Sequence, residues 1–221
     1  MKDQIWSRLS RAGWLAFAVH LLAGLAMALV LRRGLETNAD LGDRLRFVGG
    51  SRLVWTAGWI CWTVAALTIL NFYARFAAAH RSLGVSPAPL RTAVLLTVAA
   101  VAADWTAQAV EVLVLPGLAA AADAARFLAW HRTAVLLTGF LGNGLYTLSA
   151  LLLVWASRSS YPRWIQIAGF GVVAGGAALS AAAWADSAAG MLRANVVLVP
   201  GLLLWLAGVA ASAATPRGEK A

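Results

Sequence analysis

The chain has 221 residues, of which 61% are hydrophobic and 12% are charged, and its formal net charge is +9. A typical soluble domain carries about 25% charged residues, so this composition excludes an ordinary soluble protein. The apolar residues form long blocks and not alternating segments of about ten residues. We therefore expect an all-α, polytopic membrane protein that folds as one domain over residues 1–221.

Six segments are long enough to cross a bilayer, since a spanning helix needs roughly 20 apolar residues. They are predicted at 13–31, 53–76, 90–115, 133–156, 164–185 and 194–213. The basic start of the chain resembles that of a signal peptide. Its apolar run is longer than in such peptides and lacks a small-residue cleavage pattern, so we expect a retained first helix in a six-helix bundle.

The placement of Lys and Arg in short connections predicts the orientation in the membrane. With a cytoplasmic N-terminus, ten of the 18 basic residues lie on the cytoplasmic side and eight on the other. The ten are Lys2, Arg8, Arg11, Arg75, Arg81, Arg91, Arg158, Arg163, Arg217 and Lys220, and the eight are Arg32, Arg33, Arg44, Arg46, Arg52, Arg126, Arg132 and Arg193. We therefore expect both termini in the cytoplasm.

Two connections are long enough to form elements of their own. In 32–52, the apolar residues Leu41, Leu45 and Val48 have helical spacing and predict a short amphipathic helix. It would either lie flat on the membrane surface or cap the bundle. The alanine-rich connection 117–130 predicts a second surface helix.

The third span carries Asp104, Gln108 and Glu111 at spacings of four and three residues. A helix turns about 100° per residue, so these side chains share one face. An ionisable residue at the bilayer centre costs at least a few kcal/mol and usually faces a protein interior or a water-filled cavity. This face is therefore the main candidate for a functional site.

The fourth span runs antiparallel to the third and should supply the opposite wall. Antiparallel pairing predicts Asn143 near the depth of Asp104, and Glu111 near the level of His131. The candidate ligand- or ion-binding residues are Asp104, Gln108, Glu111, Asn143, Tyr146, His20 and His131. Polar pairs between membrane helices also stabilise packing by themselves, so a purely structural role stays open.

No cofactor or metal can be assigned from the sequence. The histidines His80 and His131 are predicted at opposite faces of the membrane, which disfavours a bis-histidine haem. Zinc needs three or four converging ligands, and the sequence offers no such spacing. Cys61 lies within a span and has no second cysteine to pair with.

Trp55, Trp59 and Trp62 form an aromatic stripe on the second span. The stripe could line a pocket for a flat apolar molecule, such as a quinone, a pigment or a sterol-like lipid. Packing and anchoring at the membrane interface are the alternative.

The partners expected from the sequence are lipids and proteins, not nucleic acids. The basic residues are scattered among six loops without an aromatic platform, which indicates contact with lipid headgroups and excludes nucleic-acid binding. Gly171 and Gly175 have the spacing of a close-packing motif. This motif predicts contact with a neighbouring span or, as an alternative, with a protein partner in a homodimer.

Three sequence runs together resemble a group of bacterial six-pass membrane proteins that contain a domain of unknown function. The runs are Trp55-Thr-Ala-Gly-Trp59-Ile-Cys-Trp62, the helix from Asp104 to Leu115-Pro116, and Gly142-Asn143-Gly144-Leu145-Tyr146-Thr147-Leu148. The resemblance covers most of the chain and implies no activity. The high alanine, arginine and tryptophan content is similar to that of proteins from high-GC bacteria, so we expect the bacterial inner membrane.

Three functions remain as hypotheses. The first is an intramembrane polar cavity that binds or translocates a small cation, a proton or a polar solute around Asp104. The second is a non-catalytic scaffold or accessory subunit, in which the polar residues satisfy one another. The third is a lipid-active enzyme, which is disfavoured because an activated nucleophile or metal-bound water is not visible in the sequence.

Overall fold

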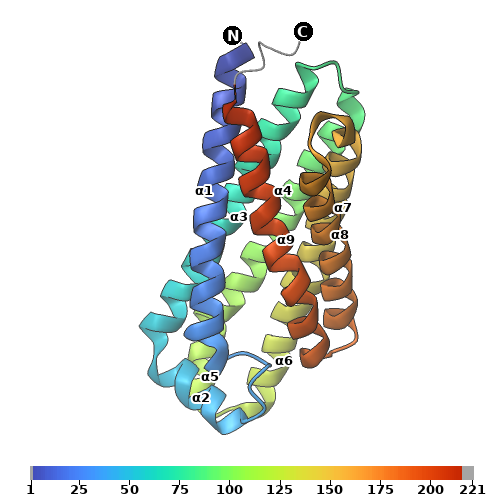
Figure 1. The fold of residues 1–221 in the computed structure, drawn as a ribbon. Coiled ribbons are helices and arrows are strands. Elements are labelled where there is room, and N and C mark those ends of the chain that lie inside the picture. Colours follow the sequence, from blue (N-terminus) through green and yellow to red (C-terminus); the bar gives the residue numbers. More distant parts are fainter. Residues whose placement is uncertain (1, 216–221) are drawn as a thin grey trace.

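The computed structural model describes residues 2–215, without the side chain of Lys2. Arg217 and Lys220, which entered the charge count together with Lys2, lie outside this part. The described chain forms helices throughout (Figure 1): α1 (Lys2–Leu29), η1 (Leu31–Arg33), α2 (Leu41–Gly50), α3 (Arg52–Arg81), α4 (Pro87–Ala109), η2 (Val110–Val114), α5 (Leu115–Ala120), α6 (Ala124–Val135), η3 (Leu136–Gly142), α7 (Asn143–Ala156), η4 (Arg158–Ser160), α8 (Arg163–Trp184) and α9 (Ala188–Ala214).

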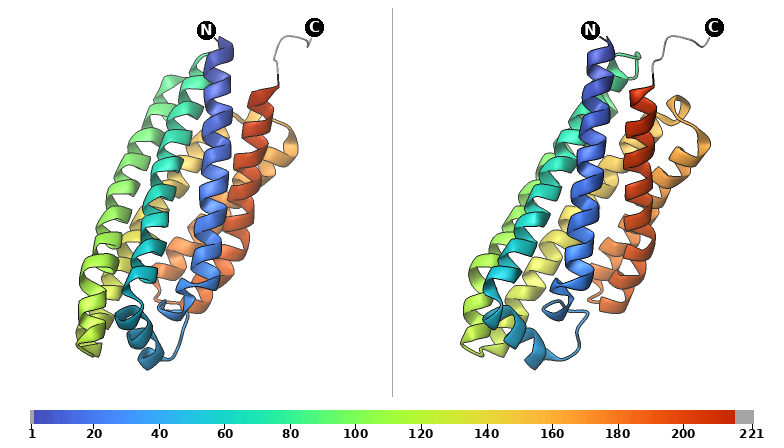
Figure 2. Two further views of the ribbon diagram at one scale, coloured as in Figure 1. Left: turned by 90° about the vertical axis from the view of Figure 1, so that its left-hand side faces the viewer. Right: turned by 60° about the vertical axis from the view of Figure 1, so that its left-hand side comes forward.

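Within residues 2–215, six helical rods are long and apolar enough to cross a membrane. The third rod consists of α4, the π-helical segment η2 and α5, and the fourth consists of α6, the π-helical segment η3 and α7. Neighbours in space run α1, α3, α4, α7, α8, α9 and back to α1, which closes a ring; Figure 2 shows α1 between α3 and α9. The predicted all-α six-helix membrane bundle is confirmed.

The helices extend beyond the apolar segments that the sequence predicts. The first predicted span begins at residue 13, whereas α1 begins at Lys2. The early turns of α1 are mixed in polarity, yet Trp6 and Leu9 are buried in the bundle core. Tertiary packing therefore extends the helix where hydropathy alone gives no signal.

The predicted surface helix at 117–130 is wrong. The third rod continues to Ala120 and the fourth begins at Ala124, so only a tight turn joins them. Ala122 occupies this turn with a φ of 54°, and Asp123 caps α6 by accepting a hydrogen bond from the Arg126 amide at 3.2 Å. Alanine favours helix, so the alanine-rich run lengthens both rods.

The amphipathic helix predicted in 32–52 is α2, and it caps the end of the bundle opposite the two termini (Figure 1). We call this end the α2 end. Phe47 and Val48 are buried beside Trp55 of α3. The amide nitrogen of Ala120 would lie only 3.0 Å from a Cβ added at Gly49, so the backbones of α2 and α5 nearly touch. The sequence left two positions open for this helix, flat on the membrane surface or over the end of the bundle, and in the structure it caps the bundle.

Helices α8 and α9 approach each other most closely at Gly175. A Cβ placed there would lie 2.6 Å from the backbone nitrogen of Leu198, whereas a Cβ at Gly171 would meet no atom within 4 Å. Small residues permit such close contact between helices in lipid. The predicted close-packing role therefore belongs to Gly175 within the same chain.

We expect Gly175→Ala to lower the free energy of unfolding by about 1–3 kcal/mol, because the added methyl group forces two backbones apart. Gly171→Ala is the matched control and should unfold like the parent. The measurement is the unfolding midpoint of the purified protein in detergent. Equal midpoints for Gly175→Ala and Gly171→Ala would contradict the close approach.

Candidate functional site

His131 of α6 lies at the centre of a polar cluster at the α2 end and is only 3% exposed. The Nη2 atom of Arg44 lies 2.6 Å from the Nδ1 atom of His131. On the other side of the ring, Nε2 lies 3.5 Å from carboxylate oxygens of both Glu111 and Glu36. A guanidinium can only donate hydrogen bonds, so Nδ1 accepts and the ring proton is on Nε2. His131 therefore presents its N–H to two carboxylates.

Arg44 enters the bundle from α2, outside the six spanning rods. Its Nε donates to the carbonyl oxygen of Gly34 at 3.4 Å, and its guanidinium carbon lies 5.5 Å from the centre of the Phe127 ring. Phe127 also stacks on His131, with the ring centroids 5.8 Å apart. An aromatic face, an imidazole nitrogen and a backbone carbonyl thus hold the guanidinium.

Glu111 lies near the start of η2 and is 2% exposed. One of its carboxylate oxygens faces His131, while the other, Oε2, is buried and has no hydrogen-bond partner among the described residues. The Glu111 backbone carbonyl accepts a hydrogen bond from Trp55 Nε1 at 2.8 Å. Most buried polar atoms in proteins are hydrogen-bonded, so the free carboxylate oxygen requires an explanation.

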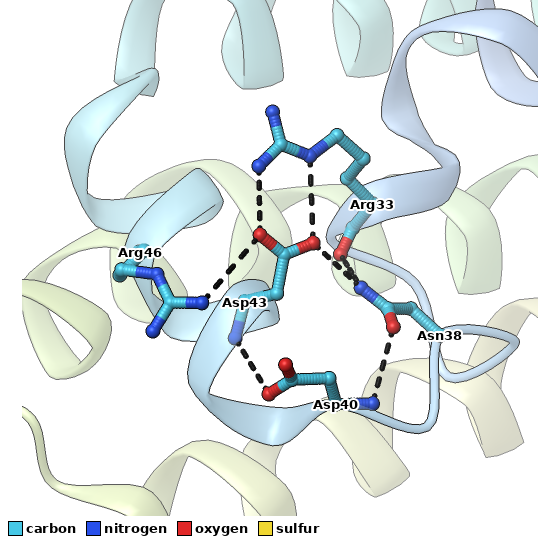
Figure 3. Close-up of polar contacts among 5 residues, drawn as sticks. All are labelled: Arg33, Asn38, Asp40, Asp43 and Arg46. Carbon is cyan, nitrogen blue, oxygen red and sulfur yellow. Dashed lines mark hydrogen bonds and ion pairs between the residues drawn. The ribbon is translucent and has the colours of Figure 1, made fainter.

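A surface network fixes the start of α2 next to Arg44 (Figure 3). Asp43 accepts from Arg33 Nη2 at 2.7 Å and from Asn38 Nδ2 at 3.0 Å, and Arg46 lies 3.8 Å away from the same carboxylate. Asp40 accepts from the Asp43 amide at 3.0 Å and caps the helix. The hydrogen bond from Arg33 holds the pKa of Asp43 below its usual range, so the network persists as a charged latch at neutral pH.

Asp104 lies deeper in the bundle, between α4 and η3. Thr138 donates to its Oδ1 at 2.6 Å. A Cβ added at Gly142 would lie 2.7 Å from the same oxygen, so only glycine leaves room for the carboxylate. The Tyr146 hydroxyl interacts with this carboxylate electrostatically but lacks the geometry of a full hydrogen bond.

The side chains of Gln108 and Asn143 form hydrogen bonds to helices that do not contact Asp104 through them. Gln108 accepts from Thr63 of α3 at 2.5 Å. Gly142 lies beside the Asp104 carboxylate, so its neighbour Asn143 lies near the depth of Asp104, as predicted. The Asn143 side-chain amide nevertheless donates to the Gly176 carbonyl at 2.7 Å and to Ser180 Oγ at 2.8 Å. The expectation that Asn143 faces Asp104 is therefore wrong, because its side chain points to α8.

His20 and the tryptophan stripe belong to the packing between α1, α3 and the α2 end. His20 Nδ1 donates to the Ala16 carbonyl of its own helix at 2.8 Å, and its ring meets the edge of Trp62. Trp55 packs edge-on against Trp59, with the centroids 5.7 Å apart. Trp59 and Trp62 have buried indole nitrogens with no partner among the described residues, and binding of an apolar ligand stays a prediction.

The predicted proximity of Glu111 and His131 is confirmed, whereas the roles of Arg44, Glu36 and Thr63 were not predicted. Arg44 carried a signal, because it lies among the apolar positions 41, 45 and 48 of an amphipathic helix, where a charge needs an internal partner. Within residues 2–215, no group of three or more His, Cys, Asp or Glu side chains could hold a metal ion.

Comparisons with protein-family models, curated proteins and solved structures found no match to this chain. The resemblance to bacterial six-pass membrane proteins thus stays a prediction from the sequence. The chemistry of the site has to be argued from its own residues.

Glu36 should make the stability of the protein depend on pH. Burial raises the pKa of its carboxyl, which Arg44 counteracts only in part. The folded state therefore keeps a proton that the unfolded state releases near pH 4.3, and stability falls as pH rises from about that value through the raised pKa. We expect Glu36→Gln to flatten this fall in melting temperature.

The matched control is Asp3→Asn, which changes an exposed acid at the opposite end of the bundle. It should retain the slope of the parent between pH 5 and pH 8. Identical slopes for Glu36→Gln and the parent would contradict the burial of this carboxyl.

Proposed function

We propose that this protein takes up a proton or a small cation at Glu111. The observation that carries the proposal is the buried carboxylate oxygen Oε2 of Glu111, which has no partner among the described residues. A proton or cation at this oxygen would remove the cost of an unsatisfied charge. Ionisable residues inside membrane spans are by default candidates for ion or proton pathways.

The arrangement of Glu36, His131 and Glu111 supports a route to this carboxylate from the α2 end. The Glu36 side chain is 27% exposed, whereas the side chains of His131 and Glu111 are 4% and 2% exposed. The imidazole nitrogen Nε2 lies at the same distance from both carboxylates. The Nε2–H group can donate to either carboxylate, so His131 would stabilise whichever of the two acids is ionised while the other holds the proton.

Asp104 is the second acid that such a pathway would reach. It lies seven residues before Glu111, or about 10 Å along the rod. Its carboxylate has Thr138 as a hydrogen-bond donor and Tyr146 nearby. We propose Asp104 as the inner site and Glu111 as the outer site.

We further propose that the protein lies in the bacterial inner membrane with the termini in the cytoplasm. All ion pairs among residues 2–215 lie at the α2 end, where they involve Arg33, Arg46, Arg126 and Arg132. The described arginines at the end with the termini form no such pair with another described residue and are available to anionic headgroups. This distribution favours the positive-inside orientation.

The proposed uptake predicts an infrared signal that depends on Glu111. In nanodiscs, a step from pH 5 to pH 8 should change a carboxylic C=O band of the parent, and Glu111→Gln should remove part of that change. Asp3→Asn should leave the spectrum as in the parent. If Glu111→Gln leaves the spectrum unchanged and titration with sodium or potassium does not alter it in the parent, the proposal is wrong.

The second candidate function is a scaffold or accessory subunit that assembles with a protein partner or with itself. It is favoured by Gln108 and Asn143, whose side chains simply join α4 to α3 and α7 to α8. Such bonds stabilise membrane helix pairs by about 0.6–2 kcal/mol. In this case Asp104 would also serve only to bind Thr138.

Asp104→Asn separates the two candidates. An asparagine keeps the acceptor for Thr138 but cannot ionise. If the protein is a scaffold, the Asp104→Asn variant should therefore melt at or above the melting temperature of the parent at every pH. In a proton- or cation-binding protein it should instead remove part of the pH or cation dependence of melting. Thermal unfolding in detergent from pH 5 to pH 8, with and without added cations, distinguishes these results.

A further inference from the structure

The guanidinium of Arg44 occupies a site that has the chemistry of an organic-cation receptor. Its acceptors are His131 Nδ1 and the Gly34 carbonyl, and the Phe127 ring lies 5.5 Å from its central carbon. Glu36 and Glu111 add negative charge around it. Neither carboxylate forms an ion pair with Arg44 among the described contacts, so the arginine does not saturate the acids.

The helix that supplies Arg44 lies outside the ring of spanning helices (Figure 1). The latch of Arg33, Asn38 and Asp43 holds its start (Figure 3), and the contact of Gly49 with α5 holds its end. Between α2 and α5 there is an open groove of about 440 Å³, lined by Leu45, Arg46, Gly49 and Ala119 among others. An outward movement of α2 would have to break these contacts and expose Phe47 and Val48.

We propose that Arg44 is a tethered occupant of a binding site for a small guanidinium or amidinium cation, and that α2 is the cover that such a cation displaces. This inference rests on the proposed function, because it assigns a ligand class to the same carboxylates. The bound cation would take the place of the Arg44 guanidinium between His131, Phe127 and the Gly34 carbonyl.

The shape of the site favours a planar cation over a spherical one. A planar guanidinium can face the Phe127 ring while its edge donates to a nitrogen and an oxygen in one plane. A zinc ion would need three or four converging protein ligands, and the described residues offer no group of three or more His, Cys, Asp or Glu side chains that could hold a metal ion. When the Arg44 guanidinium departs, Glu36 and Glu111 remain as two acids that can ionise and balance the charge of the incoming cation.

The test uses methylguanidinium and the full-length protein in detergent. Arg44→Gln removes the tethered guanidinium, so methylguanidinium should raise its melting temperature by several degrees, while tetramethylammonium at equal concentration should not. Arg52→Gln changes an exposed arginine at the start of α3, outside this network, and it should show no such rise. Arg44→Gln combined with Glu111→Gln should lose the response.

Asp43→Asn tests the cover with Arg44 still in place. Weakening the latch enlarges the fraction of molecules with α2 displaced, and apparent affinity grows in proportion to that fraction. We expect methylguanidinium to bind this variant about fivefold more tightly than the parent, as measured by calorimetry. Methylguanidinium binding to Asp43→Asn tests the proposal even if Arg44→Gln does not fold.

Two results would overturn the inference. One is no methylguanidinium binding to Asp43→Asn, or binding no tighter than to the parent. The other is a folded Arg44→Gln that responds to methylguanidinium no more than Arg52→Gln does. Glu111-dependent infrared changes in the absence of methylguanidinium binding would leave the proposed function standing and remove only the guanidinium ligand.

Discussion

Inside the hydrocarbon, a polar group has no water to bind and needs a partner on a neighbouring helix. This constraint sets the contacts between the rods of the bundle. Thr63 satisfies Gln108, Thr138 satisfies Asp104, and α8 satisfies Asn143. Each bond fixes the rotation of one helix against another. Against this background, Oε2 of Glu111 is a buried carboxylate oxygen without a hydrogen-bond partner among the described residues.

The α2 end connects this free oxygen to an element outside the ring of spanning helices. Arg44 reaches His131 from α2, and His131 reaches Glu111 from α6. The direction of hydrogen bonding is fixed by the arginine, which cannot accept. A movement of α2 would therefore change both the charge and the proton position beside Glu111. In the proposed function, uptake of a proton or cation at Glu111 and a movement of α2 would therefore influence each other.

The lengths of the apolar segments were sufficient to predict the six spans. The rise per residue along two antiparallel helices was sufficient to predict that Glu111 and His131 lie close together. Side-chain direction was harder to predict. Asn143 follows the π-helical segment η3, whose wider turn changes the face of every later residue relative to a regular α-helix. Arg44 and Glu36 lie in a connection whose path depends on the latch at Asp43 and on the burial of Val48. These contacts join residues far apart in the chain, and no local periodicity encodes them.

The tautomer of His131 tests the central claim most directly. The Nδ1 atoms of His20 and His80 donate to the carbonyls of Ala16 and Phe76, so both carry hydrogen at Nδ1. His131, facing Arg44, should instead be the neutral tautomer with hydrogen at Nε2. Nitrogen-15 NMR of histidine-labelled protein near pH 7 should show an Nε2–H signal that His131→Gln removes. A His131 signal with hydrogen at Nδ1, in the neutral or the charged ring, would contradict the account.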